Sequence, residues 1–303
     1  MNTSHTTKHR AIITGGAGFI GSYVVNELMQ QGYEPIVIDN LSKGKKENIP
    51  SGVIFHQVNI LDKEKLEEII EEGDVIFHLA ALTSVPESIE NPLPYHKTNI
   101  EGTYTLLEVA RIKKVKGIIF SSSAAVYGNK EGIANENDAT KPESPYGLHK
   151  LIGEQLLETY NKLYGISTVS LRYFNVYGKG QPETGSYAPV MARFLREKRL
   201  GNPLPIVGDG SQTRDFVNVI DVAKANVKAL ELMEEKKNFV INICGGKEIS
   251  VKEVADMISD NQTNIPPRIE IMKSCGNNSV AKEKLKWNIT IPFEKGIEEL
   301  LLS

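Results

Sequence analysis

Short apolar segments alternate with amphipathic ones along the first 175 residues, and this alternation limits the folds open to the chain. Runs rich in Ile and Val predict strands, and the segments between them predict helices. Strands separated by helices are typical of βαβ units, in which the strands run parallel. We therefore predict an α/β fold with a doubly wound parallel sheet of the Rossmann type. The expected strands are 10–14, 35–39, 53–57, 74–79, 116–121 and 167–172, and the expected helices are 18–31, 62–71, 95–114 and 144–164.

The regular alternation weakens after Asn175. The segment 178–187 contains several Gly and Pro residues, which predicts an irregular loop leading into a helix that ends near Leu200. A chain of 303 residues is long enough for one domain and a smaller lobe. We predict a main domain over 1–175 and a smaller C-terminal α/β lobe over 176–303, with 217–244 as a segment that can return to the main sheet.

Composition argues against several classes of function. The 35 Lys and Arg residues are balanced by 38 Asp and Glu, so a net charge of −3 argues against nucleic-acid binding. No apolar run approaches the roughly 18 residues that a membrane-spanning helix needs, and residues 1–8 lack the apolar core of a secretion signal. Two cysteines form no disulfide framework, which favours a reducing, cytoplasmic compartment. The six histidines are scattered without metal-ligand spacing, so we expect no metal.

Three glycines, Gly15, Gly18 and Gly21, follow the first predicted strand and open the first predicted helix. Gly15 would permit a tight turn, Gly18 a close approach of the backbone to a phosphate, and Gly21 close packing of the helix on the sheet. A helix N-terminus attracts phosphate through its free N–H groups and its partial positive charge. A glycine run alone can be an ordinary turn, but this strand–turn–helix context predicts a dinucleotide site.

The residue that selects the dinucleotide is Asp39, which lies 18 residues after Gly21 at the end of the second predicted strand. A carboxylate at this point can accept both ribose hydroxyls of NAD and would repel the 2′-phosphate of NADP. Lys43, Lys45 and Lys46 nearby weakly favour NADP instead. We predict NAD as the cofactor.

A candidate acid/base pair, Tyr146 and Lys150, lies one turn apart on the same face of a predicted helix. A free tyrosine has a pKa of about 10 and is a poor base at neutral pH. Lys150, with the positive charge of oxidised nicotinamide, is expected to lower the pKa of Tyr146. Such pairs are common on helix surfaces, but Ser121, Ser122 and Ser123 end the fifth predicted strand. Because ligands bind at the carboxyl ends of parallel strands, these hydroxyls are expected to line the same crevice.

Seven stretches, in order along nearly the whole chain, carry a family pattern. They are TGGAGFIGS (14–22), DNL (39–41), HLAA (78–81), SSSAAVYG (121–128), SPYGLHK (144–150), LRYFNVYG (171–178) and GDGSQTRDF (208–216). The chain thereby resembles the extended short-chain dehydrogenase/reductase family, and within it the NAD-dependent nucleotide-sugar epimerases of the UDP-glucose 4-epimerase type.

The resemblance implies a set of catalytic roles. Ser123 would hydrogen-bond the reacting hydroxyl, Tyr146 would be the acid/base, and Lys150 would tune Tyr146 while holding the nicotinamide ribose. Family members that dehydrate or decarboxylate a nucleotide sugar carry carboxylates just after the catalytic Ser or Thr. This chain has Ala124 and Ala125 there, which cannot transfer a proton. The resemblance therefore implies inversion at C4 of a nucleotide-diphosphate hexose, either UDP-glucose/galactose or an N-acetylhexosamine, through a transient 4-keto sugar.

The resemblance also implies contacts with the cofactor. Residues 79–81 would line it, with Asn99 supporting that wall. Asn59 stands where the family usually has an aspartate that reaches adenine, and Ile60 would pack on the adenine. The implied cofactor-binding residues are Gly15, Gly18, Phe19, Ile20, Gly21, Asp39, Asn40, Asn59, Ile60, Leu79, Ala80, Ala81, Asn99, Ser121, Tyr146, Lys150 and Tyr173.

For the substrate, the resemblance assigns Arg214 to a nucleotide phosphate, which the planar guanidinium suits. A salt bridge of Arg214 with Asp209 or Asp215 is the alternative interpretation. Asn175 is expected at the sugar or the diphosphate. The residues expected near the sugar are Thr83, Ser84 and Glu87.

The C-terminal tail departs from the family, because the usual Gly-Asp-x-Arg segment is absent. Arg268 and Glu270 can substitute for it as diphosphate and ribose ligands, or can be ordinary strand residues. Ser274 falls where the family sets the size of the pocket beside the 2-substituent of the sugar, with Cys275 as the neighbouring candidate. A small residue there would leave room for an N-acetyl group.

Two other activities remain open at this point. The same residues would serve a reductase or dehydrogenase of a nucleotide-linked keto sugar, which would release its cofactor after each turnover. A noncatalytic NAD-sensing subunit is the other alternative, and the intact set of Ser123, Tyr146 and Lys150 argues against it. Helices near 91–114 and 146–164 can pair across a two-fold axis, as the family often does, or pack within one subunit; we expect a homodimer.

Overall fold

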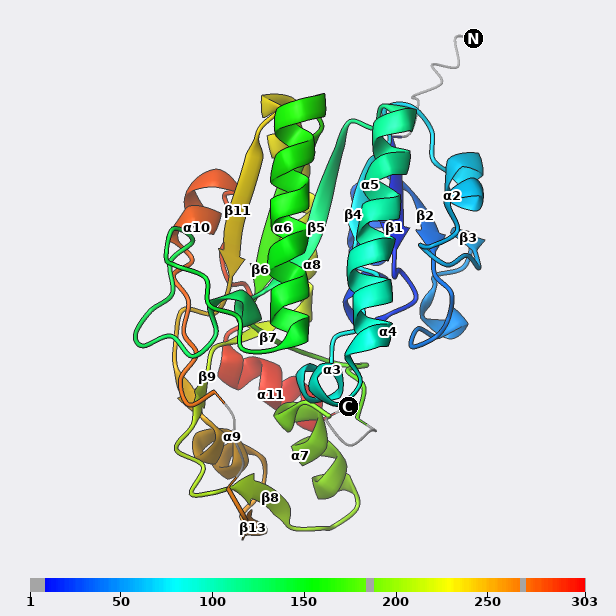
Figure 1. Ribbon diagram of the computed structural model, residues 1–303. Coiled ribbons are helices and arrows are strands. Elements are labelled where there is room, and N and C mark those ends of the chain that lie inside the picture. The colour runs from blue at the N-terminus through cyan, green and yellow to red at the C-terminus, as the bar shows by residue number, and fades with distance from the viewer. Residues whose placement is uncertain (1–8, 184–187, 268–270, 303) are drawn as a thin grey trace.

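The computed structural model describes residues 9–183, 188–267 and 271–302. At its centre is a seven-stranded sheet with the strand order β11-β6-β5-β4-β1-β2-β3 (Figure 1). All neighbouring strands pair in parallel, so the predicted doubly wound sheet is confirmed. The strands are β1 (Arg10–Thr14), β2 (Glu34–Ile38), β3 (Ile54–His56), β4 (Val75–His78), β5 (Gly117–Ser123), β6 (Ser167–Tyr173) and β11 (Asn238–Ile243).

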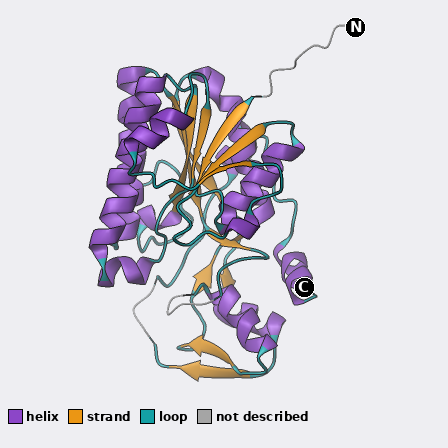
Figure 2. Cartoon of the chain, turned by 90° about the vertical axis from the view of Figure 1, so that its right-hand side faces the viewer, coloured by secondary structure: helices purple, strands orange, loops and turns teal. Residues whose placement is uncertain are grey.

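Helices cover both faces of this sheet, as Figures 1 and 2 show. One face packs on α1 (Phe19–Gln30) and α8 (Val219–Lys228), whose apolar side chains join those of the strands in one buried cluster. The opposite face packs on α2 (Lys63–Ile69), α5 (Gly102–Lys113) and α6 (Pro145–Tyr164) in a second cluster. In the described parts of the chain, no helix is long and apolar enough to cross a membrane.

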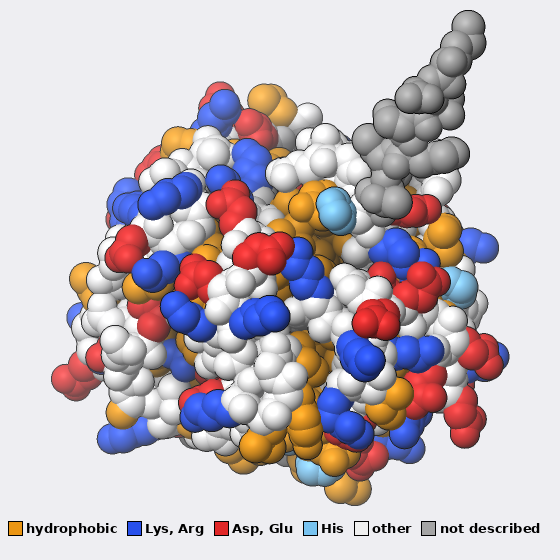
Figure 3. Space-filling model, turned by 90° about the horizontal axis from the view of Figure 1, so that it is seen from above, with side chains coloured by type: hydrophobic (Ala, Val, Ile, Leu, Met, Phe, Trp, Pro, Cys, Tyr) orange, Lys and Arg blue, Asp and Glu red, His pale blue; other side chains and the backbone are white. Residues whose placement is uncertain are grey.

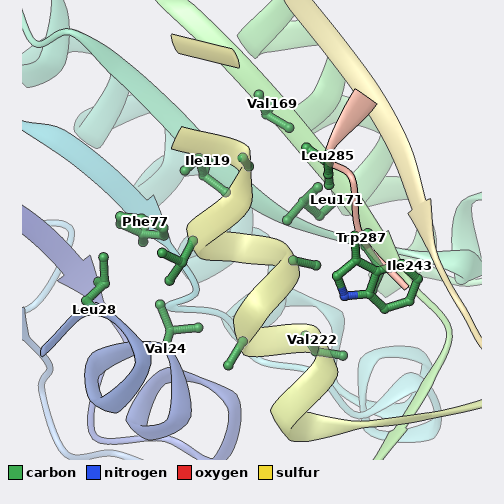
Figure 4. Packing of buried hydrophobic residues seen from close by; sticks show 14 of the residues in the cluster. Val24, Leu28, Phe77, Ile119, Val169, Leu171, Val222, Ile243, Leu285 and Trp287 are labelled. Carbon is green, nitrogen blue, oxygen red and sulfur yellow. The ribbon is translucent and has the colours of Figure 1, made fainter. Parts of the chain in front are cut away.

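The larger cluster forms around α8 (Figure 4). Val222 of α8 belongs to this cluster together with side chains of the strands and of α1, including Phe77 and Val24. Trp287 closes the cluster near β11; it is 1% exposed, and its indole N–H donates to the Asp221 carbonyl at 2.8 Å. This bond satisfies the polar end of a large side chain that is otherwise buried among apolar groups.

The smaller lobe lies below the carboxyl ends of the strands in Figure 1. A third apolar cluster holds it together, in which the rings of Phe216 and Phe293 stack with their centroids 4.9 Å apart. Its strands pair two by two: β7 (Asn175–Tyr177) with β10 (Phe216–Asn218), β9 (Thr213–Arg214) with β12 (Ile249–Ser250), and β8 (Leu204–Val207) with β13 (Gln262–Ile265). Its helices are α7 (Val190–Arg199), α9 (Val251–Ile258) and α11 (Phe293–Leu301), while α10 (Ser279–Lys284) contacts β11.

The chain crosses between the two parts more than once. After the lobe strand β10, α8 packs against α1 and β11 pairs in parallel with β6, in the register Asn238 to Thr168 through Ile243 to Tyr173. Residues 219–243 thus belong to the main sheet and its helical layer. A division of the sequence at residue 175 therefore does not coincide with the edge of the sheet.

The segment predicted as a loop over 80–94 is partly helical. It contains α3 (Val85–Glu90), for which Ser84 is the N-cap and accepts a bond from the Glu87 N–H at 3.3 Å. The following helix α4 (Pro92–His96) runs into α5 through a π-helical turn at Lys97–Glu101. Short 3₁₀ turns occur at 46–48, 124–127 and 229–235.

Candidate active site

The glycine turn after β1 has no room for side chains. Gly15 has a φ of +74°, and its carbonyl accepts a bond from the Gly18 N–H at 3.1 Å. A Cβ on Gly21 would lie 2.1 Å from that carbonyl oxygen, and one on Gly15 would lie 2.7 Å from the Ala80 nitrogen. The turn thus brings the backbone of β1, α1 and the end of β4 into direct contact, a geometry that only glycine permits.

Helix α1 starts directly from this turn. Its N-cap, Gly18, has no side chain that could occupy the N–H groups of the first turn, formed by Phe19 and Ile20. These N–H groups and the helix dipole suit a phosphate. Asp39 lies nearby at the end of β2 and is 8% exposed; its two carboxylate oxygens accept bonds from the Ala17 N–H at 3.1 Å and the Leu41 N–H at 2.8 Å. The lone pairs that remain on these oxygens can accept ribose hydroxyls.

Hydrogen bonds hold the backbone of residues 79–82, the wall that follows β4 and is expected to line the cofactor. The Leu79 and Ala80 N–H groups donate to the carbonyl and the hydroxyl of Thr14. The buried amide of Asn99 accepts a bond from the Leu82 N–H and donates to the Leu82 carbonyl, both at 2.9 Å. Asn99 therefore holds the backbone that follows Ala81, as the resemblance implies. The π-helical turn carries Asn99 to this position.

Two residues of this wall, His78 and Thr103, were not among the predicted site residues. The Nδ1 atom of His78 lies 2.8 Å from the Thr14 hydroxyl, and Nε2 lies 2.9 Å from the Thr103 hydroxyl. Thr103 donates its own proton to the Asn99 carbonyl, so Nε2 of His78 must carry the ring proton. Burial and the nearby Lys150 lower the pKa of His78 to about 3, so the ring is neutral. In the sequence, His78 is a polar residue that ends an apolar strand and begins the HLAA stretch.

The predicted adenine contacts lie at the edge of this wall. Asn59 is exposed, and its side chain accepts a bond from the Leu61 N–H at 3.0 Å. Ile60 is buried against Gly102, where its Cδ1 lies 2.5 Å from the position that a Cβ would take. Asn40 is exposed beside Asp39 and accepts a bond from the N–H of residue 42 at 3.0 Å.

The predicted catalytic residues come together at the ends of β5 and α6. The Lys150 ammonium donates to the Ser121 carbonyl at 2.6 Å and lies 5.9 Å from the centre of the Tyr146 ring. Ser123 ends β5 and hydrogen-bonds the Tyr146 side chain. The start of α6 is fixed by Ser144, which accepts a bond from the Gly147 N–H at 3.1 Å. Tyr146, near the first turn of the helix, is thereby directed at the last residue of β5.

The pKa of Tyr146 differs from the expectation of a more acidic phenol. Burial raises it above its ordinary value, and the hydrogen bond with Ser123 only partly offsets this rise. Burial also lowers the pKa of Lys150 to about 7, and the charge of Glu154 opposes that shift. In the protein without cofactor the loss of solvation therefore dominates. The prediction that Lys150 and oxidised nicotinamide together lower the pKa of Tyr146 stays a prediction for the NAD-bound protein.

Tyr173, which is expected to contact the cofactor, has a hydrogen-bond partner within the protein. Its hydroxyl donates to the side-chain oxygen of Asn226 on α8 at 2.8 Å, and the residue is 6% exposed. Burial raises its pKa. The ring belongs to the apolar cluster around α8, and its hydroxyl is satisfied by the bond to Asn226.

A cavity of about 350 Å³ is lined mainly by residues of the smaller lobe, with Pro86 from the main part. It contains Asn175 and Arg214, two of the residues expected to bind substrate. The Asn175 amide donates to the Asp215 carbonyl at 3.2 Å, and Arg214 donates to the carbonyls of Thr213 and Ile271 at 2.8 and 2.7 Å. Lining residues that the sequence analysis did not single out include Gln181, Arg193, Pro205, Val207 and Gln212.

The two carboxylates of the alternative interpretation, Asp209 and Asp215, bind backbone N–H groups. Asp209 accepts a bond from the Ser211 N–H at 2.9 Å. The Asp215 carboxylate accepts bonds from the N–H groups of Gly245, Gly246 and Gly276 at 2.6, 3.0 and 3.0 Å.

The other described residues expected near the sugar are not among those that line this cavity. Ser84 caps α3, Glu87 accepts a bond from the Tyr95 hydroxyl at 3.1 Å, and only Pro86 of that short helix lines the cavity. Ser274 is half-buried and is not among the described lining residues. Thr83 precedes the cap, while Arg268 and Glu270 lie outside the described residues. Within the described ranges, no group of three or more His, Cys, Asp or Glu side chains could hold a metal ion.

Comparison with known proteins places this site in a family. Residues 11–244 match the NAD dependent epimerase/dehydratase family. The chain belongs to this family. It is 45% identical over 251 residues to a putative UDP-glucose 4-epimerase of Methanocaldococcus jannaschii, covering 82% of this chain and 80% of that one. It is 38% identical to a UDP-N-acetyl-alpha-D-glucosaminuronate decarboxylase of Bacillus cytotoxicus, covering 97% of each.

The same likeness holds in three dimensions. The crystal structure of UDP-glucose 4-epimerase with UDP-glucose from Thermotoga maritima matches with a TM-score of 0.90 and 37% identity, covering 97% of each chain. Membership of the NAD dependent family confirms NAD as the cofactor. The protein also fits this cofactor, because Gly15 and Gly21 leave a cradle that a Cβ would fill and Asp39 stands at its side.

Proposed function

We propose that this protein is an NAD-dependent nucleotide-sugar 4-epimerase, which inverts C4 of a UDP-hexose through a transient 4-keto sugar. The observation that carries the proposal is the convergence of Ser123, Tyr146 and Lys150 at the carboxyl end of β5, beside the glycine turn. Residues 1–175 and the returning segment 217–244 would bind NAD, and the rest of 176–303 would bind the nucleotide sugar.

Each of the three residues has a distinct task in this reaction. Tyr146 takes the proton from the C4 hydroxyl when C4 is oxidised and returns it when C4 is reduced. Ser123 hydrogen-bonds the same oxygen, and the ammonium of Lys150 favours the phenolate of Tyr146. NAD, when bound, supplies the reversible hydride transfer at C4. Because the keto sugar must present its other face before reduction, the protein has to hold the nucleotide more firmly than the hexose.

The groups after Ser123 support epimerisation over a reaction that removes part of the sugar. Ala124 and Ala125 start a short 3₁₀ turn there, and the Ala125 N–H donates to the Ser123 hydroxyl at 3.1 Å. Neither side chain can act as an acid or a base. The likeness to a decarboxylase nevertheless makes loss of CO₂ from a nucleotide uronate the second candidate function.

The cavity beside β7 and β9 is the proposed site of the nucleotide diphosphate. Arg214 and Arg193 both line it, and a planar guanidinium can bind a phosphate through two hydrogen bonds. Asn175 at its edge is the proposed contact to the sugar or diphosphate. The proposed substrates are UDP-glucose/galactose or their N-acetylated counterparts, and Ser274 is the proposed neighbour of the 2-substituent.

One assay decides among these reactions. The purified protein, without added cofactor, is incubated with UDP-glucose, UDP-N-acetylglucosamine, UDP-glucuronate and UDP-N-acetylglucosaminuronate, and the products are followed by NMR. We expect the C4 epimer of a hexose and no change in the absorbance of reduced nicotinamide. Pentose formation from a uronate would establish the decarboxylase. Turnover that occurs only in a parallel incubation with added cofactor, and that consumes this cofactor, would establish the net reductase.

We also infer that the protein forms a homodimer in the cytoplasm. Exposed apolar side chains lie along the outer face of α4, α5 and α6, among them Leu93, Tyr104, Leu148 and Leu163. Figure 3 shows hydrophobic side chains gathered between charged ones on the edge formed by these helices. Light scattering should give twice the chain mass of 33.5 kDa, and Tyr104→Glu should give the single mass.

The proposed compartment is consistent with the state of the cysteines. Both are free and buried, which suits a reducing compartment.

A further inference from the structure

Glu154 lies one helical turn after Lys150, on the same buried face of α6. The two residues are 5% and 3% exposed. Burying a carboxylate or an ammonium costs free energy unless the charge is paired and hydrogen-bonded. Glu154 is absent from the residues expected to act in the reaction, so its burial this close to Lys150 requires a separate explanation.

Three bonds hold the Glu154 carboxylate. The Arg172 guanidinium donates to both of its oxygens, from Nε at 2.9 Å and from Nη2 at 2.7 Å. The Ser122 hydroxyl donates to Oε1 at 2.5 Å. A two-pronged bond to a guanidinium is short and directional. The carboxylate thus has one fixed orientation between α6, β5 and β6.

Arg172 is itself held from its far side. Its Nη1 donates to the Tyr127 hydroxyl at 2.9 Å and to the Glu136 carbonyl at 3.1 Å. Tyr127 in turn donates to the side-chain oxygen of Asn242 at 2.7 Å. These bonds fix the position of the Arg172 guanidinium. The ion pair with Glu154 is therefore held in one geometry, unlike an exposed pair on the protein surface.

The end of β5 receives two neighbouring links from α6. Ser121 accepts the Lys150 ammonium through its carbonyl, and Ser122 donates to Glu154 through its hydroxyl. The next residue is Ser123, which hydrogen-bonds the Tyr146 side chain. A displacement of Glu154 would therefore move the strand end that carries Ser123 relative to the helix that carries Tyr146 and Lys150.

The surroundings of Lys150 show why a negative charge matters here. Phe120 of β5 presents its ring 4.9 Å from the ammonium, His78 of β4 is neutral, and Tyr146 is an uncharged phenol. Arg172 of β6 carries a positive charge. Glu154 is the carboxylate that opposes the effect of burial on the pKa of Lys150.

We propose that Glu154 is a positioning residue of the reaction, whose carboxylate, locked by Arg172 and Ser122, fixes α6 against the end of β5 and keeps Lys150 charged beside Tyr146. This inference rests on the proposed epimerase function for its catalytic meaning. Its effect on the charge of Lys150 can be measured without any turnover. The ammonium form is the form that favours a phenolate, so loss of the Glu154 charge should disable the acid/base pair at a lower pH.

The first test is the titration of Lys150 in the NAD-loaded protein, followed by NMR of ¹³C-labelled lysine side chains. The Lys150→Met variant assigns the signal by its loss. In Glu154→Gln, the midpoint of this titration should move down by about one pH unit, because a carboxylate near a cation commonly shifts its pKa by that much or more. The control is Glu158→Gln, one turn further along α6, whose partner is the exposed Lys162. That variant should leave the midpoint unchanged.

Glu154→Gln leaves Arg172 buried without its counter-charge, and this can prevent folding. The double variant Glu154→Gln with Arg172→Met removes both charges and keeps the test available. It should also lower the Lys150 midpoint, but by less than Glu154→Gln alone, because the positive charge of Arg172 is removed together with the negative charge of Glu154. A Lys150 midpoint that stays in place in whichever of these two variants folds would overturn the proposal.

The second test is the pH profile of epimerisation. In Glu154→Gln, the alkaline fall in kcat should begin about one pH unit earlier than in the unsubstituted protein. In the double variant it should begin earlier by a smaller amount, while Glu158→Gln keeps the original profile. A purely structural role would lower kcat at every pH and leave the profile in place, and that result would also overturn the proposal. If Lys150 titrates as expected but the unsubstituted protein epimerises no nucleotide hexose, the proposed function fails and the effect of Glu154 on Lys150 stands.

Discussion

At the scale of single residues, the phenol of Tyr146 is kept protonated by its surroundings until further charge arrives. Burial raises its pKa, and Ser123 opposes this only in part. Lys150, with a pKa of about 7, holds its own proton only weakly. The positive ring of bound NAD would add the charge that favours the phenolate. The acid/base pair is therefore completed by the cofactor, which couples proton transfer to cofactor binding.

The simplest test at this scale is Tyr146→Phe. Removal of the phenolic oxygen should reduce epimerisation by about 10²- to 10⁴-fold, the usual contribution of a positioned acid/base group. NAD should remain bound, as measured by its absorbance after gel filtration. Tyr164→Phe is the control, because it makes the same change on the same helix at a half-exposed side chain. Full activity in Tyr146→Phe would remove Tyr146 from the mechanism.

A second residue-scale prediction concerns Asp39. The change to Asn keeps the shape of the side chain but removes the charge that repels a 2′-phosphate. The preference for NAD over NADP should fall by about tenfold or more, since a hydrogen bond to a charged group contributes about 1.5–3 kcal/mol. The ratio of the two dissociation constants measures it, with Asp62→Asn, at the cap of α2, as the control. An unchanged ratio would count against Asp39 as the selecting residue.

At the scale of elements, the junction of β1 and α1 determines whether a dinucleotide can bind. Gly15 leaves the strand with positive φ, and Gly21 lies against its carbonyl. The two ends of the turn are thus in contact. The turn also contacts the backbone of residues 79–80, which follow β4. A Cβ at either position would clash with backbone atoms and not with a flexible side chain, so the backbone would have to shift.

Gly21→Ala tests this junction. The new methyl carbon would lie 2.1 Å from the Gly15 oxygen, so the turn must open and carry the first turn of α1 with it. We expect NAD affinity to fall at least about tenfold, which is about 1.4 kcal/mol, together with a lower melting temperature. Ser22→Ala, at the next residue of the helix, should change both quantities much less. Equal effects of the two substitutions would show that the turn tolerates a side chain.

The same scale shows which features the sequence could predict. Periodicity and caps predicted the main helices and strands to within a few residues, as for α6, which Ser144 and Gly165 bound as expected. Helix α3 was missed because it has only six residues, contains Pro86 and ends just before Pro92. The π-helical turn has no local signal, since it is coupled to the contacts between Asn99 and Leu82, 17 residues apart.

The candidate site divides in the same way. Residues in compact motifs, such as Tyr146 with Lys150, could be found from their spacing together with the serines that end the fifth predicted strand. Glu154 was not found, because its importance depends on Arg172 and Ser122, which only the packing of β5, β6 and α6 brings to it. Arg193 reaches the cavity from a helix with several basic residues, and nothing in the sequence distinguishes it from its neighbours.

At the scale of the whole molecule, Asp215 joins the lobe to the main sheet. It lies between β9 and β10, and its carboxylate binds the N–H groups of Gly245 and Gly246 after β11 and of Gly276 in the C-terminal segment. The residue is fully buried. Burial raises its pKa to about 6 even though these three bonds favour the charged form.

Because the pKa of Asp215 is raised, the connection that it makes between the lobe and the main sheet depends on pH. The folded protein binds a proton at Asp215 more readily than the unfolded chain, whose carboxyl has a pKa of about 3.8. Its contribution to stability is therefore full below about pH 4 and is lost as the pH rises through about 6. A difference of about two pKa units corresponds to about 3 kcal/mol in the free energy of unfolding.

Asp215→Asn isolates this contribution. Asn cannot titrate, so the variant should carry a constant penalty for its mismatched N–H group and lack the decline in stability between about pH 4 and 7. Urea unfolding of both proteins across this range gives the difference in the free energy of unfolding. Subtraction cancels the other titrating groups, and the remaining curve should fall by about 3 kcal/mol with its midpoint near pH 5. A flat difference would show that Asp215 stays charged in the folded protein, held by its three backbone bonds against the cost of burial.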